Sequence, residues 1–102
     1  MRGCDLQEIY DFLMIGNQIV FIYDNKMYFM DHEDHMFIVD RYEGNYKNLF
    51  DGSHKKVKMK VICRYKYKEQ NMEAVEGFLN EKCYDGKSFY EIEKDVEIDR
   101  VY

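Results

Sequence analysis

The sequence predicts a single α+β domain spanning residues 1–102: an antiparallel four-stranded meander, with an N-terminal helix and two C-terminal helices packed on one face. Three observations predict this class. Capping-box patterns begin helices near both ends of the chain. Residues 18–42 are rich in Ile, Val, Phe and Tyr, and residues 56–68 alternate between apolar and basic side chains. With 46% hydrophobic residues, the chain is long enough to bury a core.

The first helix is predicted to begin after Asp5. The Asp5 side chain can accept hydrogen bonds from free backbone N–H groups, and Glu8 can reach back to the Asp5 backbone, as in a capping box. Gly16 can adopt the left-handed conformation that closes a helix. The helical spacing places one apolar stripe in the core: Leu6, Ile9, Tyr10 and Leu13.

The β-rich stretch that follows predicts three strands. They are Ile19–Tyr23, Met27–Met30 and Met36–Tyr42. Asp24-Asn25 tolerates positive φ and suits a tight hairpin turn, and Asp31–His35 is a second polar turn. Both faces of these strands are apolar, and such strands are usually covered on both sides. Either the sheet curls around its own core, or the uncovered face meets another chain.

Residues 56–68 predict a fourth, longer strand with one apolar and one basic face. Ile62 is the only error in the alternation, and thirteen residues at about 3.3 Å each would exceed most strands, so we expect a bend or bulge near Ile62-Cys63. A polar connection precedes this strand, with one helical turn expected around Tyr46–Phe50. Four cations of the basic face form a candidate surface: Lys58, Lys60, Arg64 and Lys66.

Two helices, the second of them short, are predicted near the C-terminal end. Asn71 can cap the first of them, which we expect to end near Cys83. Ser88 and Glu91 form a capping box that begins the other. The tail at residues 96–98 alternates again, and the sequence leaves open whether it adds a terminal strand.

The acidic residues are concentrated in the first half of the chain. Residues 1–53 carry ten acids and four bases, a balance of −6, whereas residues 54–102 carry ten acids and eleven bases, a balance of +1. A compact acidic domain can imitate the charge spacing of nucleic acid and occupy a basic cleft on a partner, although an ordinary acidic surface explains the pattern equally well. The candidate acidic surface comprises Asp31, Glu33, Asp34 and Asp40.

The basic strand has two interpretations. Acids elsewhere in the chain can neutralise its cations across the sheet, or the cations can contact a phosphate backbone. Tyr65 and Tyr67 lie between the cations in sequence, but by parity they point to the opposite face, which weakens a base-stacking platform.

We expect no catalytic or metal centre. Residues 31–35 read Asp-His-Glu-Asp-His, but they lack the helical His-Glu-x-x-His spacing, and we interpret them as a solvated turn. The sequence contains neither a Gly-rich phosphate loop nor a Gly-x-Ser-x-Gly elbow, so we expect a protein that is not an enzyme and has no cofactor.

Cysteine usage and hydropathy predict a cytoplasmic protein. Cys4, Cys63 and Cys83 are odd in number and have no Cys-x-x-Cys spacing, so we expect free thiols in a reducing compartment and neither a disulfide nor a zinc site. The longest apolar run is far short of the roughly 20 residues of a membrane span, and the first residues show no signal-peptide pattern. We therefore expect no membrane association.

Two motifs resemble those of a known group of proteins. The hairpin residues 21–28, Phe-Ile-Tyr-Asp-Asn-Lys-Met-Tyr, and the closing pattern Asp85-Gly86-Lys87-Ser88-Phe89-x-Glu91-Ile92 resemble small proteins of low-GC Gram-positive bacteria, their phages and mobile elements. Those proteins typically have Asn-Gly where this chain has Asp24-Asn25, and the basic strand is not part of their pattern. The resemblance carries over no catalytic residue. It implies a setting in which small acidic α+β proteins inhibit host defence machinery, including CRISPR nucleases.

The sequence thus predicts a non-enzymatic protein-binding module, an anti-defence inhibitor of the anti-CRISPR type, that acts through its acidic surface or an exposed sheet face. Its expected partner is a host or defence-system protein, and a homodimer is also considered. The alternative is a small nucleic-acid-binding or regulatory protein that uses residues 56–68.

Overall fold

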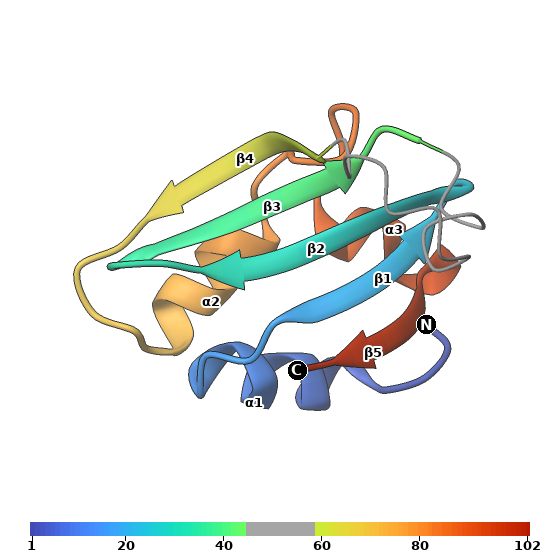
Figure 1. Cartoon of the computed structure of the whole chain (residues 1–102). Coiled ribbons are helices and arrows are strands. Elements are labelled where there is room, and N and C mark those ends of the chain that lie inside the picture. Colours follow the sequence, from blue (N-terminus) through green and yellow to red (C-terminus); the bar gives the residue numbers. More distant parts are fainter. Residues whose placement is uncertain (45–58) are drawn as a thin grey trace.

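A five-stranded antiparallel sheet and three α-helices form the protein in a computed structural model that describes residues 1–44 and 59–102 (Figure 1). The helices are α1 (Leu6–Met14), α2 (Met72–Leu79) and α3 (Phe89–Ile92), and a 3-10 turn, η2 (Glu93–Asp95), follows α3. The strands are β1 (Ile19–Tyr23), β2 (Lys26–His32), β3 (Met36–Tyr42), β4 (Met59–Lys66) and β5 (Glu97–Val101). The helical turn expected around Tyr46–Phe50 lies outside the described residues.

The sheet has one strand more than the predicted meander. Its strand order is β4-β3-β2-β1-β5, and every neighbouring pair is antiparallel. The alternating tail forms β5, which pairs with β1 and carries Ile98 opposite the buried Phe21. The α+β class is therefore confirmed, and the count of four strands is corrected to five. The extra strand forms because β1 would otherwise be an edge strand with unpaired backbone groups.

Both hairpin turns use residues in the left-handed region. Asp24 and Asn25 have φ values of 51° and 59°, as the predicted tight turn requires, and Asp34 and His35 have φ values of 40° and 60°. The second turn is shorter than the sequence predicted, because the Glu33 N–H donates to the Met36 carbonyl at 2.8 Å and closes it. Residues 31 and 32 consequently belong to β2 and not to the turn.

The predicted helix caps are present. Capping boxes join Asp5 with Glu8 at α1 and Ser88 with Glu91 at α3, and the Asn71 side chain accepts from the Ala74 N–H at 2.9 Å. However, α2 ends at Leu79 and not near Cys83. The chain leaves α2 early because residues 81–87 form a turn and an isolated bridge in place of a further helical turn.

Aromatic side chains dominate the core between the sheet and the helices. Phe21 lies 5.2 Å from Tyr28, 5.6 Å from Phe89 and 5.7 Å from Tyr84, measured between ring centroids. Each of these four rings is at most 2% exposed. Figure 1 shows α1, α2 and α3 gathered on one side of the sheet, as predicted, so this core occupies a single face, which we call the covered face.

Gly77 is the glycine that this packing requires. It lies inside α2, where glycine costs about 1 kcal/mol relative to alanine. A Cβ at this position would meet the hydroxyl oxygen of Tyr65 well inside van der Waals distance. The residue therefore marks a close approach of α2 to β4.

Candidate functional site

A bulge in β4 determines which side chains reach the other face of the sheet. Val39 pairs with Cys63, but the next residue of β3, Asp40, pairs with Val61, so Ile62 is the extra residue of β4. The bulge expected near Ile62-Cys63 is therefore confirmed. Because directly opposed residues share a face, Val61 lies beside Asp40 on the face away from the helices, and Cys63 lies on the covered face.

The bulge also divides the candidate basic surface. Lys60 pairs with Arg41 on the covered face, whereas Arg64 and Lys66 pair with Ile38 and Met36 on the opposite face. Strict alternation had placed Lys60, Arg64 and Lys66 together, and the extra residue reverses the parity between them. Lys58 lies outside the described residues. The basic residues of β4 thus do not form one continuous stripe.

Outward side chains of β2, β3 and β4 line a hollow on the face away from the helices, with a volume of about 390 Å³. We define the open face by six of these side chains: Asp31, Met36, Ile38, Asp40, Val61 and Arg64. His32 and Glu33 at the end of β2 complete the lining. Val61 is 38% exposed, so apolar surface is accessible between the charged groups.

The hollow brings together three of the four residues of the candidate acidic surface. Asp31, Glu33 and Asp40 all line it, although they come from two strands and a turn. Asp34 does not; it lies in the β2–β3 turn and lines a neighbouring hollow with Lys66 and others. The structure therefore joins most of the predicted acidic set with Arg64, one member of the competing basic set.

Asp31 and Asp40 interact electrostatically on this face. Burial is the main cause that raises the pKa of Asp40, and the negative charge of Asp31 raises it further, whereas Arg64 opposes the shift. Asp31 is held in place because the Gln18 side-chain amide donates to it at 3.3 Å and the His32 backbone N–H donates to it at 2.8 Å. The positive charge of Arg64 therefore offsets only part of the effect that burial and Asp31 have on Asp40.

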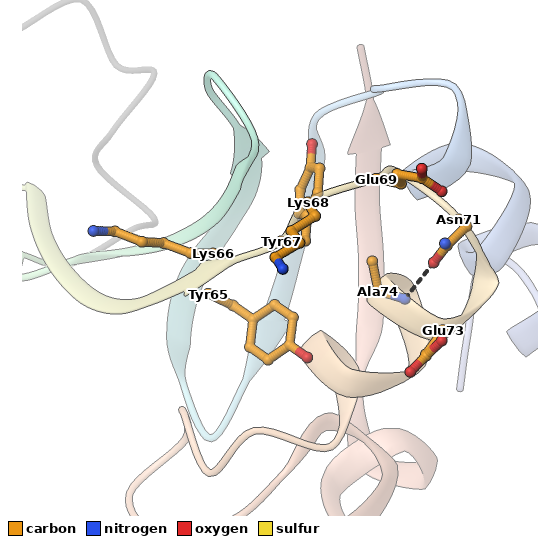
Figure 2. Close-up of a pocket in the computed structure, with 8 residues that line it drawn as sticks. All are labelled: Tyr65, Lys66, Tyr67, Lys68, Glu69, Asn71, Glu73 and Ala74. Atoms are coloured by element: carbon orange, nitrogen blue, oxygen red, sulfur yellow. Dashed lines mark hydrogen bonds between the residues drawn. The ribbon is translucent and has the colours of Figure 1, made fainter.

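A second hollow lies between the end of β4 and the beginning of α2 (Figure 2). Its lining residues are Tyr65, Lys66, Tyr67, Lys68, Glu69, Asn71, Glu73 and Ala74. Figure 2 shows the Tyr65 ring directed toward α2 and Lys66 directed away from it, while Asn71 is engaged in capping the helix. The charged groups here are of both signs and do not converge on one point, so this hollow presents no recognisable catalytic or ion-binding arrangement.

The two histidines of residues 31–35 are separated. The His32 ring lies against Gly16 and 6.5 Å from the Phe37 ring, whereas His35 lies 5.9 Å from the Tyr67 ring, measured between centroids. Among residues 1–44 and 59–102, no group of three or more His, Cys, Asp or Glu side chains is arranged to hold a metal ion. This part of the structure therefore gives no support for a metal centre.

Cys63 and Cys83 form a disulfide, contrary to the expectation of free thiols. Their Cα atoms are 5.4 Å apart, within the normal range for a cystine, and the bond joins β4 to the turn after α2. Cys4 remains free. This pairing had no signal in the sequence, because the two cysteines are 20 residues apart and meet only when β4 packs on the helical layer.

Three apolar residues of the open face and one ion pair were not predicted as parts of a site. Met36 and Ile38 were placed on one face of their strand without a prediction of which face the helices cover, and Val61 was placed on the apolar face of residues 56–68 together with Cys63, from which the bulge separates it. If Ile62 is treated as the extra residue of a bulge, and Cys63 pairs with Val39, then Val61 pairs with the next residue of β3, which is Asp40. The ion pair between Arg41 and Asp85, with a 3.6 Å separation of nitrogen and oxygen, depended on tertiary contact and had no sequence signal.

The fold and the hollow together define a small α+β protein with one helix-covered sheet face and an accessible hollow on the other face. Searches of protein-family models, curated proteins and solved structures found no match to the chain. The resemblance to proteins of phages and mobile elements therefore stays a prediction. No helix within the described residues has the length and apolar character needed to cross a membrane.

Proposed function

We propose that this protein is a non-enzymatic protein-binding module whose open face binds a basic surface of a partner protein. One observation carries the proposal: the open-face hollow joins Asp31, Glu33 and Asp40 with the accessible apolar side chain of Val61. Protein interfaces combine such apolar contact with complementary charge at their polar groups.

The net negative charge of the open-face hollow favours a partner with a basic surface. Three carboxylates and one guanidinium line it, which leaves a formal charge of −2 with His32 neutral. A lysine or arginine of a partner placed between Asp31 and Asp40 would relieve their mutual repulsion, the effect that contributes to the raised pKa of Asp40. A second acidic copy of this face would increase the repulsion, so the arrangement favours a different protein over a homodimer.

The class of target follows from the same charge. A basic cleft that normally contacts nucleic acid would accept a compact acidic surface, and the first half of the chain, with its balance of −6, supplies one. A host or defence-system protein of this kind is the target that the sequence predicts, and an anti-CRISPR-type inhibitor would be one instance.

A paired capture experiment tests the proposal. The wild-type protein and an Asp31→Asn/Asp40→Asn variant are immobilised, exposed to nuclease-treated bacterial lysate, and compared by quantitative mass spectrometry. A Glu81→Gln/Asp95→Asn variant is the control, because it removes the same charge from exposed positions outside the open face. We expect a basic partner retained by the wild type and the control, and lost from the open-face variant.

Equal capture by all three proteins would overturn the role of the open face. For a captured partner, amide chemical shifts of the isotope-labelled protein would then locate the contact. Shifts centred on β2, β3 and the outward residues of β4 support the proposal, and shifts confined to the helical layer contradict it.

The nucleic-acid alternative has less geometric support. Arg64 and Lys66 project from the open face, whereas Tyr65 points toward α2 on the covered face, so these cations do not share a surface with this ring (Figure 2). Affinity for a single-stranded oligonucleotide that falls steeply with salt would restore this alternative.

A further inference from the structure

The two edge strands of the sheet, β5 and β4, differ in how their outer backbone groups are hydrogen-bonded. At the β5 edge, the Arg2 backbone N–H donates to the Val96 carbonyl at 2.9 Å, and the Ile98 N–H donates to the Arg2 carbonyl at 2.8 Å. This bridge satisfies part of the outer backbone of β5. At the other edge, β4 pairs with β3 on one side, and within the described residues no strand pairs with its other side. Such an edge is a template for an added strand.

Cations line both sides of the β4 edge. Lys60 projects from the covered face, and Arg64 and Lys66 project from the open face, while Lys68 follows the end of the strand. The eight residues of β4 include no acid. Within the described residues, Lys60, Lys66 and Lys68 form no ion pair. Lys60, Lys66 and Lys68 therefore carry positive charge that no ion pair within the described residues neutralises, whereas Arg64 interacts with Asp40 on the open face.

We propose that the edge of β4 away from β3 binds an extended acidic segment of a partner protein, which adds to the sheet as a further strand. Backbone hydrogen bonds to β4 would hold the segment, and its carboxylates would select this edge. An added strand has side chains on both faces, about 5 Å from the β4 side chains opposite them. Acids on either face of the segment would thus meet Lys60 or the Arg64 and Lys66 pair.

The placement of these cations favours an acidic strand over other occupants of the β4 edge. A second copy of β4 would bring lysines opposite or diagonal to cations of the first copy, which disfavours self-pairing. A nucleic acid would need cations on one surface, whereas here they lie on two. The acidic segment fits both faces. The proposed edge site shares Arg64 with the open face but takes a ligand of the opposite charge, and its test varies Lys60 and Lys66, which the proposed function does not use.

The test uses a fluorescent peptide of about eight residues, the length of β4, in which Glu-Glu pairs alternate with Val-Thr pairs so that both faces of the added strand carry carboxylates. Fluorescence anisotropy measures its affinity for the disulfide-bonded protein, and amide hydrogen exchange follows the backbone of residues 59–66. We expect binding with slowed exchange in β4. The same peptide N-methylated at alternate residues keeps its charge but cannot form the ladder, and we expect it to bind at least about tenfold more weakly.

Two charge-reversal variants complete the test. Lys60→Glu/Lys66→Glu is expected to weaken peptide binding at least about tenfold, whereas Lys87→Glu/Lys94→Glu makes the same net change at exposed positions away from β4 and is expected to retain it. Far-UV circular dichroism checks that both variants are folded.

Three results would overturn the proposal. The first is no binding of the acidic peptide at millimolar concentration. The second is equal binding of its N-methylated form, which would indicate electrostatic attraction without strand addition. The third is a preference for a single-stranded oligonucleotide that depends on Lys60 and Lys66, which would assign the edge to nucleic acid. None of these results bears on the capture of a basic partner by Asp31 and Asp40, so the two proposals fail separately.

Discussion

The two faces of the sheet differ in burial and in the side chains that they carry. On the covered face, Phe21, Tyr28, Tyr84 and Phe89 exclude water and the Cys63–Cys83 disulfide joins β4 to the helical layer. On the open face, apolar side chains of similar type stand among Asp31, Asp40 and Arg64 and remain partly accessible. The difference predicts that the covered face contributes most of the stability, and our proposal makes the open face the binding surface. Substitutions on the two faces should therefore affect different measurements.

The largest expected effect is the loss of an aromatic ring from the covered face. Phe89 is 0% exposed and packs edge-to-face against Phe21, so Phe89→Ala should lower the free energy of unfolding by about 3–5 kcal/mol. Chemical denaturation measures the change. Phe29→Ala is the matched substitution, because Phe29 points away from the helices and is only half-buried. Equal losses in the two variants would contradict the contrast between the faces.

The disulfide should contribute the next largest effect. Closing a loop of 20 residues restricts the unfolded chain, and its loss should cost about 3 kcal/mol by the loop-entropy estimate. Dithiothreitol should therefore lower the denaturation midpoint of the oxidised wild type. A Cys63→Ser/Cys83→Ser variant should no longer respond to the reductant, whereas Cys4→Ser should respond as the wild type does. A midpoint that is insensitive to dithiothreitol in the oxidised wild type would refute the bond.

A smaller effect is expected where α2 approaches β4. Gly77→Ala gains about 1 kcal/mol of helix propensity but forces the Tyr65 ring to move, and overpacking of this kind costs about 1–3 kcal/mol. We expect a net loss of about 1 kcal/mol in thermal or chemical unfolding. Adding Tyr65→Phe removes the hydroxyl that is closest to the new methyl group and should recover part of the loss. A Gly77→Ala protein more stable than the wild type would contradict the close contact.

The smallest effect on stability is expected at the open face. Asp40→Asn removes a carboxylate that burial and Asp31 disfavour, so stability at neutral pH should rise, by less than about 0.5 kcal/mol. The sign follows from the pKa: a carboxyl whose pKa is raised by folding loses stability as pH rises from the unfolded value through the folded one. The gain should accordingly vanish in acid, below the ordinary pKa of about 3.9. Denaturation at two pH values measures this, and a loss at neutral pH would show that the charge is stabilised in the free protein.

Local rules in the sequence were enough to predict most of the fold. The caps at Asp5, Asn71 and Ser88 and the turn at Asp24-Asn25 depend on neighbouring residues alone, and all are present. The fifth strand was left open because three alternating residues carry little information until β1 is available as a partner. The early end of α2 was missed because residues 81–87 satisfy their backbone groups in a turn.

The candidate site was less accessible to sequence analysis. Asp31, Glu33 and Asp40 were selected by charge, but their convergence depends on the pairing of β2 with β3. Lys60 lies on a different face from Arg64 and Lys66 because β4 has one extra residue, Ile62. Residues before and after Ile62 therefore alternate in opposite phase. Tertiary pairing, not composition, decides which charges share a face.

The burial of Tyr84 gives the protein an optical reporter of its own folding. The chain has ten tyrosines and no tryptophan, so its near-ultraviolet absorbance comes mainly from phenol rings. Burial raises the pKa of Tyr84, and burial together with a hydrogen bond to Tyr10 raises that of Tyr90. Both rings should therefore stay neutral in the native protein at pH values where exposed tyrosines have become phenolates. In an alkaline titration, their late and abrupt ionisation would mark the opening of the covered face without any added label.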